Sequence, residues 1–192
     1  GEVIFANKSF RDAGDEMAGS VVDVGPSLLL VGGTLFDDDY NQYGKLYGVN
    51  PDSGDKVFSF TPEDPCFTPT AIAYKDRVVA CFGYDNNIYL VDYAGDVLHK
   101  WELDSNPWYL PLAGVTGVFY YWLDEELRAV DINDYSVRFC VDDGNDDCYG
   151  LVPWDDTILF SFGYPYFVKY SGPPKGDVWC SVLLCVGRQQ TK

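Results

Sequence analysis

A fourfold repeat of about 40 residues constrains the fold of this chain more strongly than any other feature of its sequence. An apolar segment that ends in a turn-forming residue recurs at 46–50, 88–92, 127–131 and, more weakly, 167–171. A turn and another apolar segment follow each copy. In the first two copies Gly54 aligns with Gly95, and Phe60 aligns with Trp101. This double register indicates true structural repeats.

Each repeat consists of short alternating apolar and polar segments that are separated by Asp, Asn, Gly and Pro, a pattern typical of β-strands. Strands are expected at 20–24, 27–31, 46–50, 57–60, 70–74, 77–82, 88–92, 97–103, 110–115, 117–122, 127–131, 149–153, 157–162, 167–171 and near 179–186. Four short antiparallel strands every ~40 residues are typical of a β-propeller blade. The sequence therefore predicts an all-β, propeller-like fold with about four blades of four antiparallel strands.

The repeats define the expected organisation of the chain. We expect a single propeller-like domain over residues 1–192. Its first residues, 1–19, are expected to form an N-terminal extension or latch strand. The repeats themselves cover about 20–68, 69–109, 110–148 and 149–187. The first repeat also carries an insertion at 34–44, which separates its second and third strands.

Residues 46–60 resemble the repeat of the PQQ-like, or quinoprotein-type, β-propellers. In that pattern a Leu-Tyr-Ala-Leu-Asp strand precedes a Thr-Gly-Lys turn and an aromatic strand. Residues 88–101 are similar, with Trp101 in the aromatic place. The third and fourth repeats match loosely, because Asp134 replaces the turn glycine in one and a Pro-Pro pair at 173–174 interrupts the other. The resemblance concerns architecture.

The number of blades leaves two arrangements open. PQQ-like propellers usually close with seven or eight blades, and propellers in general with four to eight. The chain therefore either closes as a four-bladed ring, with residues 1–19 latching against the strand near 179–186, or forms half of a larger ring that a partner or a second copy completes. Quinone-dependent dehydrogenases need a full ring and adjacent cysteines. Since no two cysteines are adjacent here, no cofactor is expected.

The charge of the chain is strongly acidic, at −17, with only 13 Lys and Arg. Such a field repels phosphate backbones, so nucleic acid is not an expected partner, and no apolar run approaches the ~20 residues of a transmembrane helix. Only six of the 30 acidic residues are Glu, and the rest are Asp. Because Asp hydrogen-bonds its own backbone in turns, most of these residues are expected to form turns.

The six cysteines form an even set without the paired spacing of a zinc site. Cys140 and Cys148 flank a turn-rich segment and are the candidates for a disulfide, although free buried thiols are the alternative. A single Asn7-Lys8-Ser9 glycosylation sequon adds to the expectation of an extracytoplasmic location, secreted or in an organelle lumen.

Catalytic chemistry finds little support in these residues. The only histidine, His99, is expected in an outer strand, and no nucleophile elbow accompanies it. Paired carboxylates for glycoside hydrolysis stay an alternative, since 30 acidic residues make close pairs common. Calcium binding by 37–39 or 142–147 is a further alternative, in a calcium-dependent secreted or lumenal structural protein.

Aromatic and Asp-rich segments between the strands are the expected contacts with a partner, because Tyr and Trp concentrate in interface hot spots. The candidates are Asp37, Asp38, Asp39, Tyr40, Tyr43, Trp108, Tyr109, Tyr164 and Tyr166. The sequence thus predicts a noncatalytic binding or scaffolding module within a larger assembly. Its partner would be a protein, basic if the acidic field selects it, or a second copy of the chain.

Overall fold

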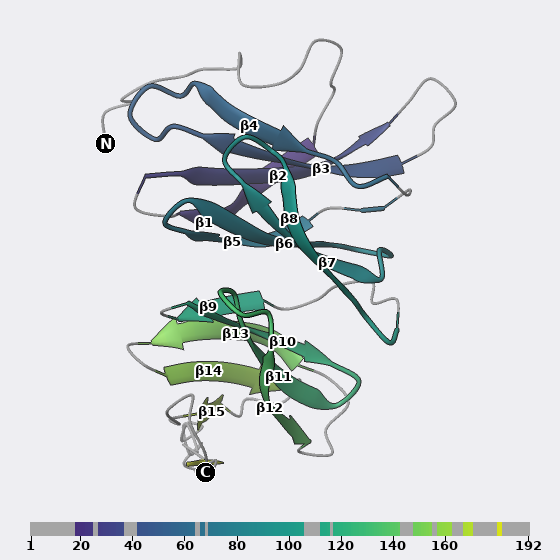
Figure 1. Ribbon diagram of the computed structural model, residues 1–192, viewed down its shortest axis with the longest axis vertical. Coiled ribbons are helices and arrows are strands. Elements are labelled where there is room, and N and C mark those ends of the chain that lie inside the picture. The colour runs from purple at the N-terminus through teal and green to yellow at the C-terminus, as the bar shows by residue number, and fades with distance from the viewer. Residues whose placement is uncertain are drawn as a thin grey trace, which may run out of the picture. The chain divides into compact units, whose positions relative to one another are not determined.

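The computed structural model describes residues 18–24, 27–36, 42–63, 66–67, 69–105, 112–115, 117–142, 148–154, 157–162, 167–170 and 180–181. These residues form strands and turns, arranged as four antiparallel sheets of four strands each (Figure 1). The chain divides into two compact units, Gly1–Leu110 with the first two sheets and Pro111–Lys192 with the last two. No helix in the described part is long and apolar enough to cross a membrane.

The sheets follow the chain in order, so each is one blade of four consecutive strands. Blade one contains β1 (Ala18–Val24), β2 (Leu29–Phe36), β3 (Gln42–Val49) and β4 (Lys56–Phe60). Blade two contains β5 (Pro69–Tyr74), β6 (Arg77–Phe82), β7 (Asn87–Asp92) and β8 (Val97–Glu102). Blade three contains β9 (Leu112–Val115), β10 (Val118–Leu123), β11 (Glu126–Asp131) and β12 (Val137–Asp142). Blade four contains β13 (Cys148–Trp154), β14 (Thr157–Phe162), β15 (Phe167–Tyr170) and β16 (Cys180–Ser181).

The predicted all-β fold of four blades is confirmed, and the predicted strands coincide with the observed ones to within a few residues. The alignment of Phe60 with Trp101 is also confirmed, because Phe60 pairs with Leu46 and Trp101 with Ile88 at the same register. The predicted insertion at 34–44 lies between the second and third strands of blade one, where it lengthens their hairpin. In this hairpin Thr34 pairs with Gly44 and Phe36 with Gln42.

The turn between the third and fourth strand has the same construction in blades one, two and three. Asn50, directly after β3, and the last residues of β7 and β11, Asp92 and Asp131, each accept the amide two residues later with a side-chain oxygen, at 2.8, 2.8 and 2.7 Å. The left-handed conformation that follows falls on Gly54 (φ 75°), Gly95 (φ 92°) and Tyr135 (φ 65°). Tyr135, and not Asp134, therefore takes the place of the glycine in the third repeat, contrary to the sequence prediction.

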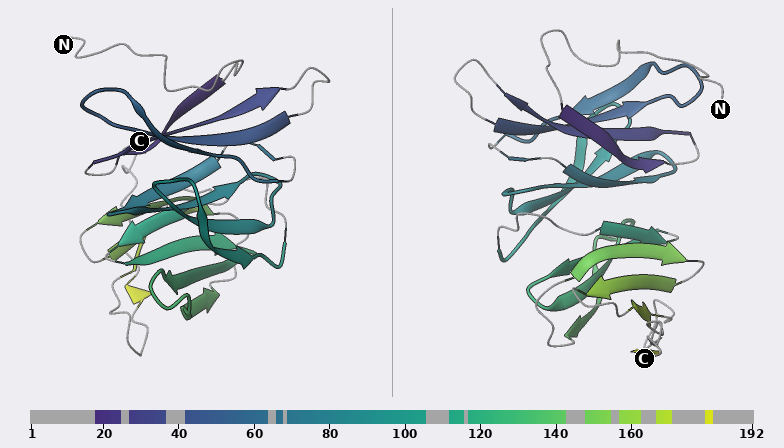
Figure 2. Two further views of the ribbon diagram at one scale, coloured as in Figure 1. Left: turned by 45° about the horizontal axis from the view of Figure 1, so that its top comes forward. Right: turned by 180° about the vertical axis from the view of Figure 1, so that it is seen from behind.

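The core of the first unit lies between blade one and blade two, which pack face to face (Figure 2). Blade one contributes Leu28, Leu30, Leu46, Phe58 and Phe60, and blade two contributes Ala71, Val78, Ala80, Phe82, Tyr89 and Val91. The Phe60 ring lies 5.1 Å from the Tyr89 ring and 5.8 Å from the Phe82 ring, both edge to face. Aromatic pairs of this geometry stabilise beyond their buried area and so help to hold the two blades together in one compact unit.

Candidate binding surface

The first unit has a well-defined end at which the second and third strands of both blades are joined. Because neighbouring strands are antiparallel, β2 and β6 end there, β3 and β7 begin there, and the connection from β4 to β5 passes there. We call this the central-hairpin end, and the opposite end, with the turns after β3 and β7, the outer-turn end. Loops at the ends of rigid sheets commonly carry binding residues.

The connection between the blades is fastened to both of them at the central-hairpin end. The Gly44 amide donates to the Cys66 sulfur at 3.2 Å, and the Phe67 amide donates to the Gly83 carbonyl at 2.8 Å. A Cβ at Gly44 would lie 2.0 Å from the Phe67 carbonyl oxygen. Only glycine allows this close approach of two backbones. The Phe67 side chain is thus held in a fixed position between blade one and blade two.

Exposed aromatic rings lie on this fixed backbone. Tyr84, in the β6–β7 turn, is 49% exposed, and its ring centroid lies 5.0 Å from that of the half-buried Phe67. Phe36 is 52% exposed and lies two residues beyond Thr34, on the face of β2 that looks toward blade two. Two residues along a strand are about 7 Å. Phe36, Phe67 and Tyr84 together form what we call the aromatic end.

The backbone of Tyr84 is in the left-handed conformation, with φ of 61°. A bulky residue at positive φ costs roughly 1–2 kcal/mol relative to glycine. Backbone strain of this kind is found most often at functional sites, where the strained side chain contributes to function although it lowers stability. The preceding residue of the turn is Gly83, but the strained position itself is occupied by a tyrosine. The tyrosine ring is therefore the feature that the turn presents.

A buried polar cluster lies beneath the aromatic end. Asp85 is 2% exposed and accepts a hydrogen bond from the Asn87 amide group at 2.6 Å. The Asp85 amide in turn donates to the Phe82 carbonyl at 3.0 Å. Burial and the neighbouring Asp85 carboxylate raise the pKa of the Tyr89 hydroxyl. The cluster fixes the β6–β7 turn from below, because buried charge-assisted hydrogen bonds are shorter and stronger than neutral ones.

The chemistry of this end favours binding over catalysis. Burial raises the pKa of the Cys81 thiol, so it stays protonated and is a poor nucleophile. Cys66 is likewise buried and is not part of a disulfide. His99 lies in the outer strand β8 as expected, with its ring 4.5 Å from that of Trp101, so no histidine is available as a base at the aromatic end. What remains accessible is a set of aromatic rings on a rigid frame.

The described residues test few of the predicted site residues. Tyr43 lies in β3 opposite Leu35, on the face of blade one that points away from blade two, and is half-buried. The other candidates, Asp37, Asp38, Asp39, Tyr40, Trp108, Tyr109, Tyr164 and Tyr166, lie outside the described residues, as do the side chains of Cys140 and Cys148. Within the described residues no group of three His, Cys, Asp or Glu could hold a metal ion. Calcium binding by 37–39 or 142–147 therefore stays a prediction.

Phe36, Phe67, Tyr84 and Asp85 are not among the residues that the sequence pattern predicted. Phe36 adjoins the predicted contact segment 37–40, so its neighbourhood was found although the residue was not. The Gly-Tyr-Asp-Asn segment at 83–86 could have indicated Tyr84, because an aromatic residue is unusual in a turn that joins two strands. Nothing local marks Phe67, whose position depends on contacts with residues distant in the chain.

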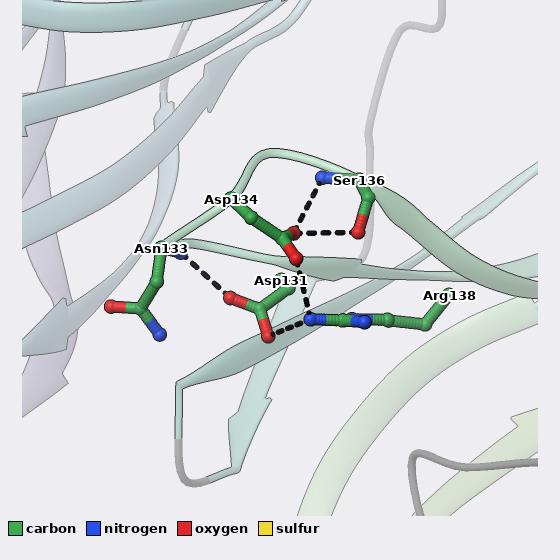
Figure 3. Close-up of polar contacts among 5 residues, drawn as sticks. All are labelled: Asp131, Asn133, Asp134, Ser136 and Arg138. Atoms are coloured by element: carbon green, nitrogen blue, oxygen red, sulfur yellow. Dashed lines mark hydrogen bonds and ion pairs between the residues drawn. The ribbon is translucent and has the colours of Figure 1, made fainter.

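Acidic residues at the outer-turn end have a structural role (Figure 3). In blade three the Arg138 guanidinium bridges Asp131 at 2.6 Å and Asp134 at 2.8 Å. Asp134 accepts both the amide and the hydroxyl of Ser136, which lowers the pKa of its carboxyl. Partial burial acts to raise the pKa of Asp131, but hydrogen bonds from the Asn133 amide and from Arg138 outweigh burial and lower it. The expectation that Asp residues form turns is confirmed at these positions.

Comparison with known proteins identifies the fold. No family model matches the chain, and no curated protein matches its sequence. Solved β-propellers match its structure. Sqt1 of Saccharomyces cerevisiae matches with a TM-score of 0.60 and 15% identity, over 88% of this chain and 48% of Sqt1.

Two further solved structures match at similarly low identity. A chain of the mitotic checkpoint complex matches with a TM-score of 0.59 and 12% identity, over 93% of this chain and 67% of that one. The WD40 β-propeller domain of Doa1 matches with a TM-score of 0.55 and 14% identity, over 77% of this chain and 48% of that one. The architecture is therefore that of a β-propeller, and the chain spans about half the length of Sqt1 and of the Doa1 chain.

Proposed function

We propose that this chain is a noncatalytic binding module that presents the aromatic end to a protein partner. The observation that carries the proposal is Tyr84, a half-exposed aromatic residue held at φ 61° beside Phe67. Preorganised aromatic rings bind with little loss of conformational entropy, which is why they dominate interface hot spots. The fastened backbone at Gly44, Cys66 and Gly83 supplies the rigidity.

The partner we propose is a protein with a basic contact surface. The chain carries a net charge of −17, and the three Asp residues at 37–39 directly follow Phe36. Opposite charges steer association and exclude wrong partners, while aromatic contacts supply affinity. Cationic side chains also pack favourably on aromatic faces. Nucleic acid has the wrong charge for this surface.

The similarity to WD40 domains supports a binding function over an enzymatic one. One matched neighbour was solved as a chain of the mitotic checkpoint complex, so propellers of this shape occur in protein assemblies. A carbohydrate-active enzyme would need two convergent carboxylates, at least one of them with a raised pKa. Asp131 and Asp134 are two neighbouring carboxyl groups of this kind, but hydrogen bonds lower the pKa of each instead of raising it.

We also propose three finer assignments from the sequence pattern. The repeats at 46–60 and 88–101 are of the PQQ-like type, the protein functions outside the cytoplasm, and Cys140 and Cys148 form a disulfide. The cysteine assignment fits an oxidising compartment. Peptide mapping without reduction is the direct measurement, and recovery of both cysteines as free thiols would contradict the disulfide and weaken the proposed location.

Photo-crosslinking tests the proposed surface. A photoreactive amino acid at Phe36 or Tyr84 should cross-link one discrete protein in extracts of the source cells, whereas the same group at Val97, which is 48% exposed at the outer-turn end, should not. In the purified complex, Phe36→Ser with Tyr84→Gly should weaken binding at least tenfold. Tyr84→Gly relieves the strained φ, so reduced binding would not reflect unfolding. Unchanged affinity of the folded double variant would refute the proposal.

A further inference from the structure

One oxygen of the buried Asp85 carboxylate has no hydrogen-bond partner among the residues that the structure describes. Its Oδ1 accepts from the Asn87 amide group at 2.6 Å, whereas its Oδ2 is buried and accepts no hydrogen bond from the described residues. No Lys or Arg in the same part of the chain forms an ion pair with Asp85. Burying a carboxylate without a counter-charge lowers stability. Asp85 is therefore a group for which another molecule can supply the counter-charge.

The exposed ring of Tyr84 is the neighbour of this carboxylate in the chain. Consecutive Cα atoms are about 3.8 Å apart, so the buried carboxylate lies close to the surface at which the ring is exposed. The Tyr84 ring is 49% exposed, and its centroid lies 5.0 Å from that of Phe67, with 59° between the ring planes. An accessible aromatic ring near a buried carboxylate attracts a cation in two ways, through the negative face of its π-system and through the neighbouring charge.

Blade three contains the same combination of groups together with a cation. The Arg128 Nε lies 2.8 Å from the Glu126 carboxylate, and the guanidinium carbon lies 5.9 Å from the centroid of the Tyr121 ring. One guanidinium thus interacts with a carboxylate and an aromatic ring at the same time. At the aromatic end Asp85 supplies the carboxylate and Tyr84 the ring, but among the described residues no Lys or Arg lies over the Tyr84 ring.

We propose, on the basis of the binding function proposed above, that the aromatic end binds an arginine side chain of its protein partner. The guanidinium packs on the Tyr84 ring and interacts with the charge of Asp85. Arginine is favoured over lysine because its guanidinium is planar, stacks on aromatic faces and is more weakly hydrated than an ammonium group. The guanidinium does not need to touch Asp85, because a buried charge is screened much less than an exposed one.

The charge of the chain supports a basic partner over another copy of the chain as the source of this arginine. With 30 acidic residues and only 13 Lys and Arg, two copies repel each other, whereas a basic partner is attracted. The backbone hydrogen bond from Phe67 to Gly83 holds both rings in place before binding, so little conformational entropy is lost when the partner binds.

NMR titration of the complete chain with short peptides tests the arginine site. The probe is acetyl-Gly-Arg-Gly-amide, and in its control peptide citrulline, which has the shape of arginine without the charge, replaces the arginine. We expect the arginine peptide to shift the amide signals of residues 83–86 with a Kd of about 5 mM, and the citrulline peptide to bind at least tenfold more weakly. A lysine peptide should bind more weakly than the arginine peptide. Equal binding of the arginine and citrulline peptides, or no shift at residues 83–86, would overturn the proposal.

Asp85→Asn keeps the shape of the side chain and an acceptor for the Asn87 amide group but removes the charge. It should weaken binding of the arginine peptide at least tenfold without lowering the Tm, because a buried charge without a counter-charge is removed. Asp52→Asn removes the same charge at an exposed position of the outer-turn end and should leave the affinity unchanged. Equal weakening by both variants would show that net charge alone attracts the peptide, which would refute the site.

Variants of Tyr84 give a second test that leaves Asp85 in place. Tyr84→Phe keeps the aromatic face and should bind the arginine peptide as the wild type does, whereas Tyr84→Gly should bind it at least fivefold more weakly. Failure of the arginine site and failure of the proposed function are distinguishable. If Phe36→Ser with Tyr84→Gly weakens binding of the protein partner but Asp85→Asn does not, the arginine site is refuted and the binding surface stands. If the peptide binds at residues 83–86 but Tyr84 cross-links no protein, the arginine site is supported and the proposed function fails.

Discussion

The two ends of the blades differ in how far they repeat. At the outer-turn end, blades one, two and three share one device, in which a residue at the end of the third strand or directly after it accepts the amide two residues later at 2.7 to 2.8 Å. At the central-hairpin end the described parts of the three connections differ. Blade one extends its hairpin to Phe36, blade two has the turn at 83–86, and blade three closes with a two-residue turn at Asp124 and Glu125.

This difference separates structural from functional demands. A turn that only reverses the chain has one good solution, so the repeats keep it even when tyrosine replaces glycine at Tyr135. A surface that binds a partner needs different side chains at each blade. The strained and exposed Tyr84, the overhanging Phe36 and the buried Asp85 all lie at the end that varies. Divergence among the repeats at this end is consistent with the binding surface that we propose there.

The largest effect is expected at Gly44, which fastens the central-hairpin end. Gly44→Ala places a Cβ 2.0 Å from the Phe67 carbonyl oxygen and 2.6 Å from the Phe82 ring. Both neighbours must move, so we expect a loss of about 3 kcal/mol in the free energy of unfolding. Urea unfolding measures this loss. Lys100→Ala, on the exposed side of β8, is the control and should change stability little.

Asn87 tests whether the buried cluster supports the variable turn. Asn87→Ala removes the amide that donates to Asp85 at 2.6 Å and leaves a buried carboxylate without that donor. We expect a cost of about 2 kcal/mol, the usual penalty for an unsatisfied buried group. The exposed Lys100 of β8 again provides the control, since Asn86 accepts a hydrogen bond from the Asn87 amide group at 3.4 Å and so belongs to the same cluster. Equal destabilisation by both changes would argue that the cluster has no special role.

Tyr135 tests whether the outer turns are one device. Tyr135→Gly should stabilise the protein by about 1 kcal/mol, because glycine adopts the observed φ of 65° without strain. Gly54→Ala, at φ 75° in blade one, should destabilise by a similar amount. Thermal unfolding of the two variants gives both values. Opposite signs support a shared geometry, and a destabilised Tyr135→Gly would show that the ring has its own stabilising contacts.

The smallest effect is a pH dependence at Asp131. Its pKa is lowered in the folded protein, so the charged carboxylate stabilises the fold at pH values above the unfolded pKa, near 3.9. Asp131→Asn keeps the turn acceptor but removes the charge that bridges Arg138. We expect the wild type to be more stable than the variant by about 0.5 kcal/mol at pH 7. This difference should disappear as the pH falls through the folded pKa, and one that persists at pH 2 would rule out the carboxylate as its cause.

Much of the fold could be predicted from local patterns. Residues 77–82 and 157–162 coincide with predicted strands because β-strands alternate with period two and end at turn residues. The error in the third repeat arose because the turn after Asp131 is one residue longer than the turn after Asp92, which shifts the left-handed position to Tyr135. If the two turns are taken to be equally long, the glycine position of the third repeat falls one residue too early, on Asp134.

The candidate site was predicted only in part, because contacts between residues far apart in the sequence bring its side chains together. Phe36 is the last residue of β2, whose end no sequence periodicity marks, and the contact of Gly44 with Cys66 joins residues 22 positions apart. Phe67 and Tyr84 meet because the connection between two blades passes the turn of the second blade. No local sequence pattern predicts the path of this connection, since the path depends on how the two sheets pack.

The sequence by itself determined the strands, the repeat and the outer turns, because these depend on neighbours within a few residues of one another. The tertiary structure decided which side chains of those strands face another blade and which remain accessible. Tyr47 and Tyr89 occupy equivalent positions in the repeat and are both buried, and the ring that packs against Tyr89 is Phe60 of the preceding blade. The burial of a side chain depends on what packs against its face of the sheet. A sequence repeat determines which side chains share that face, but not which part of the molecule packs on it.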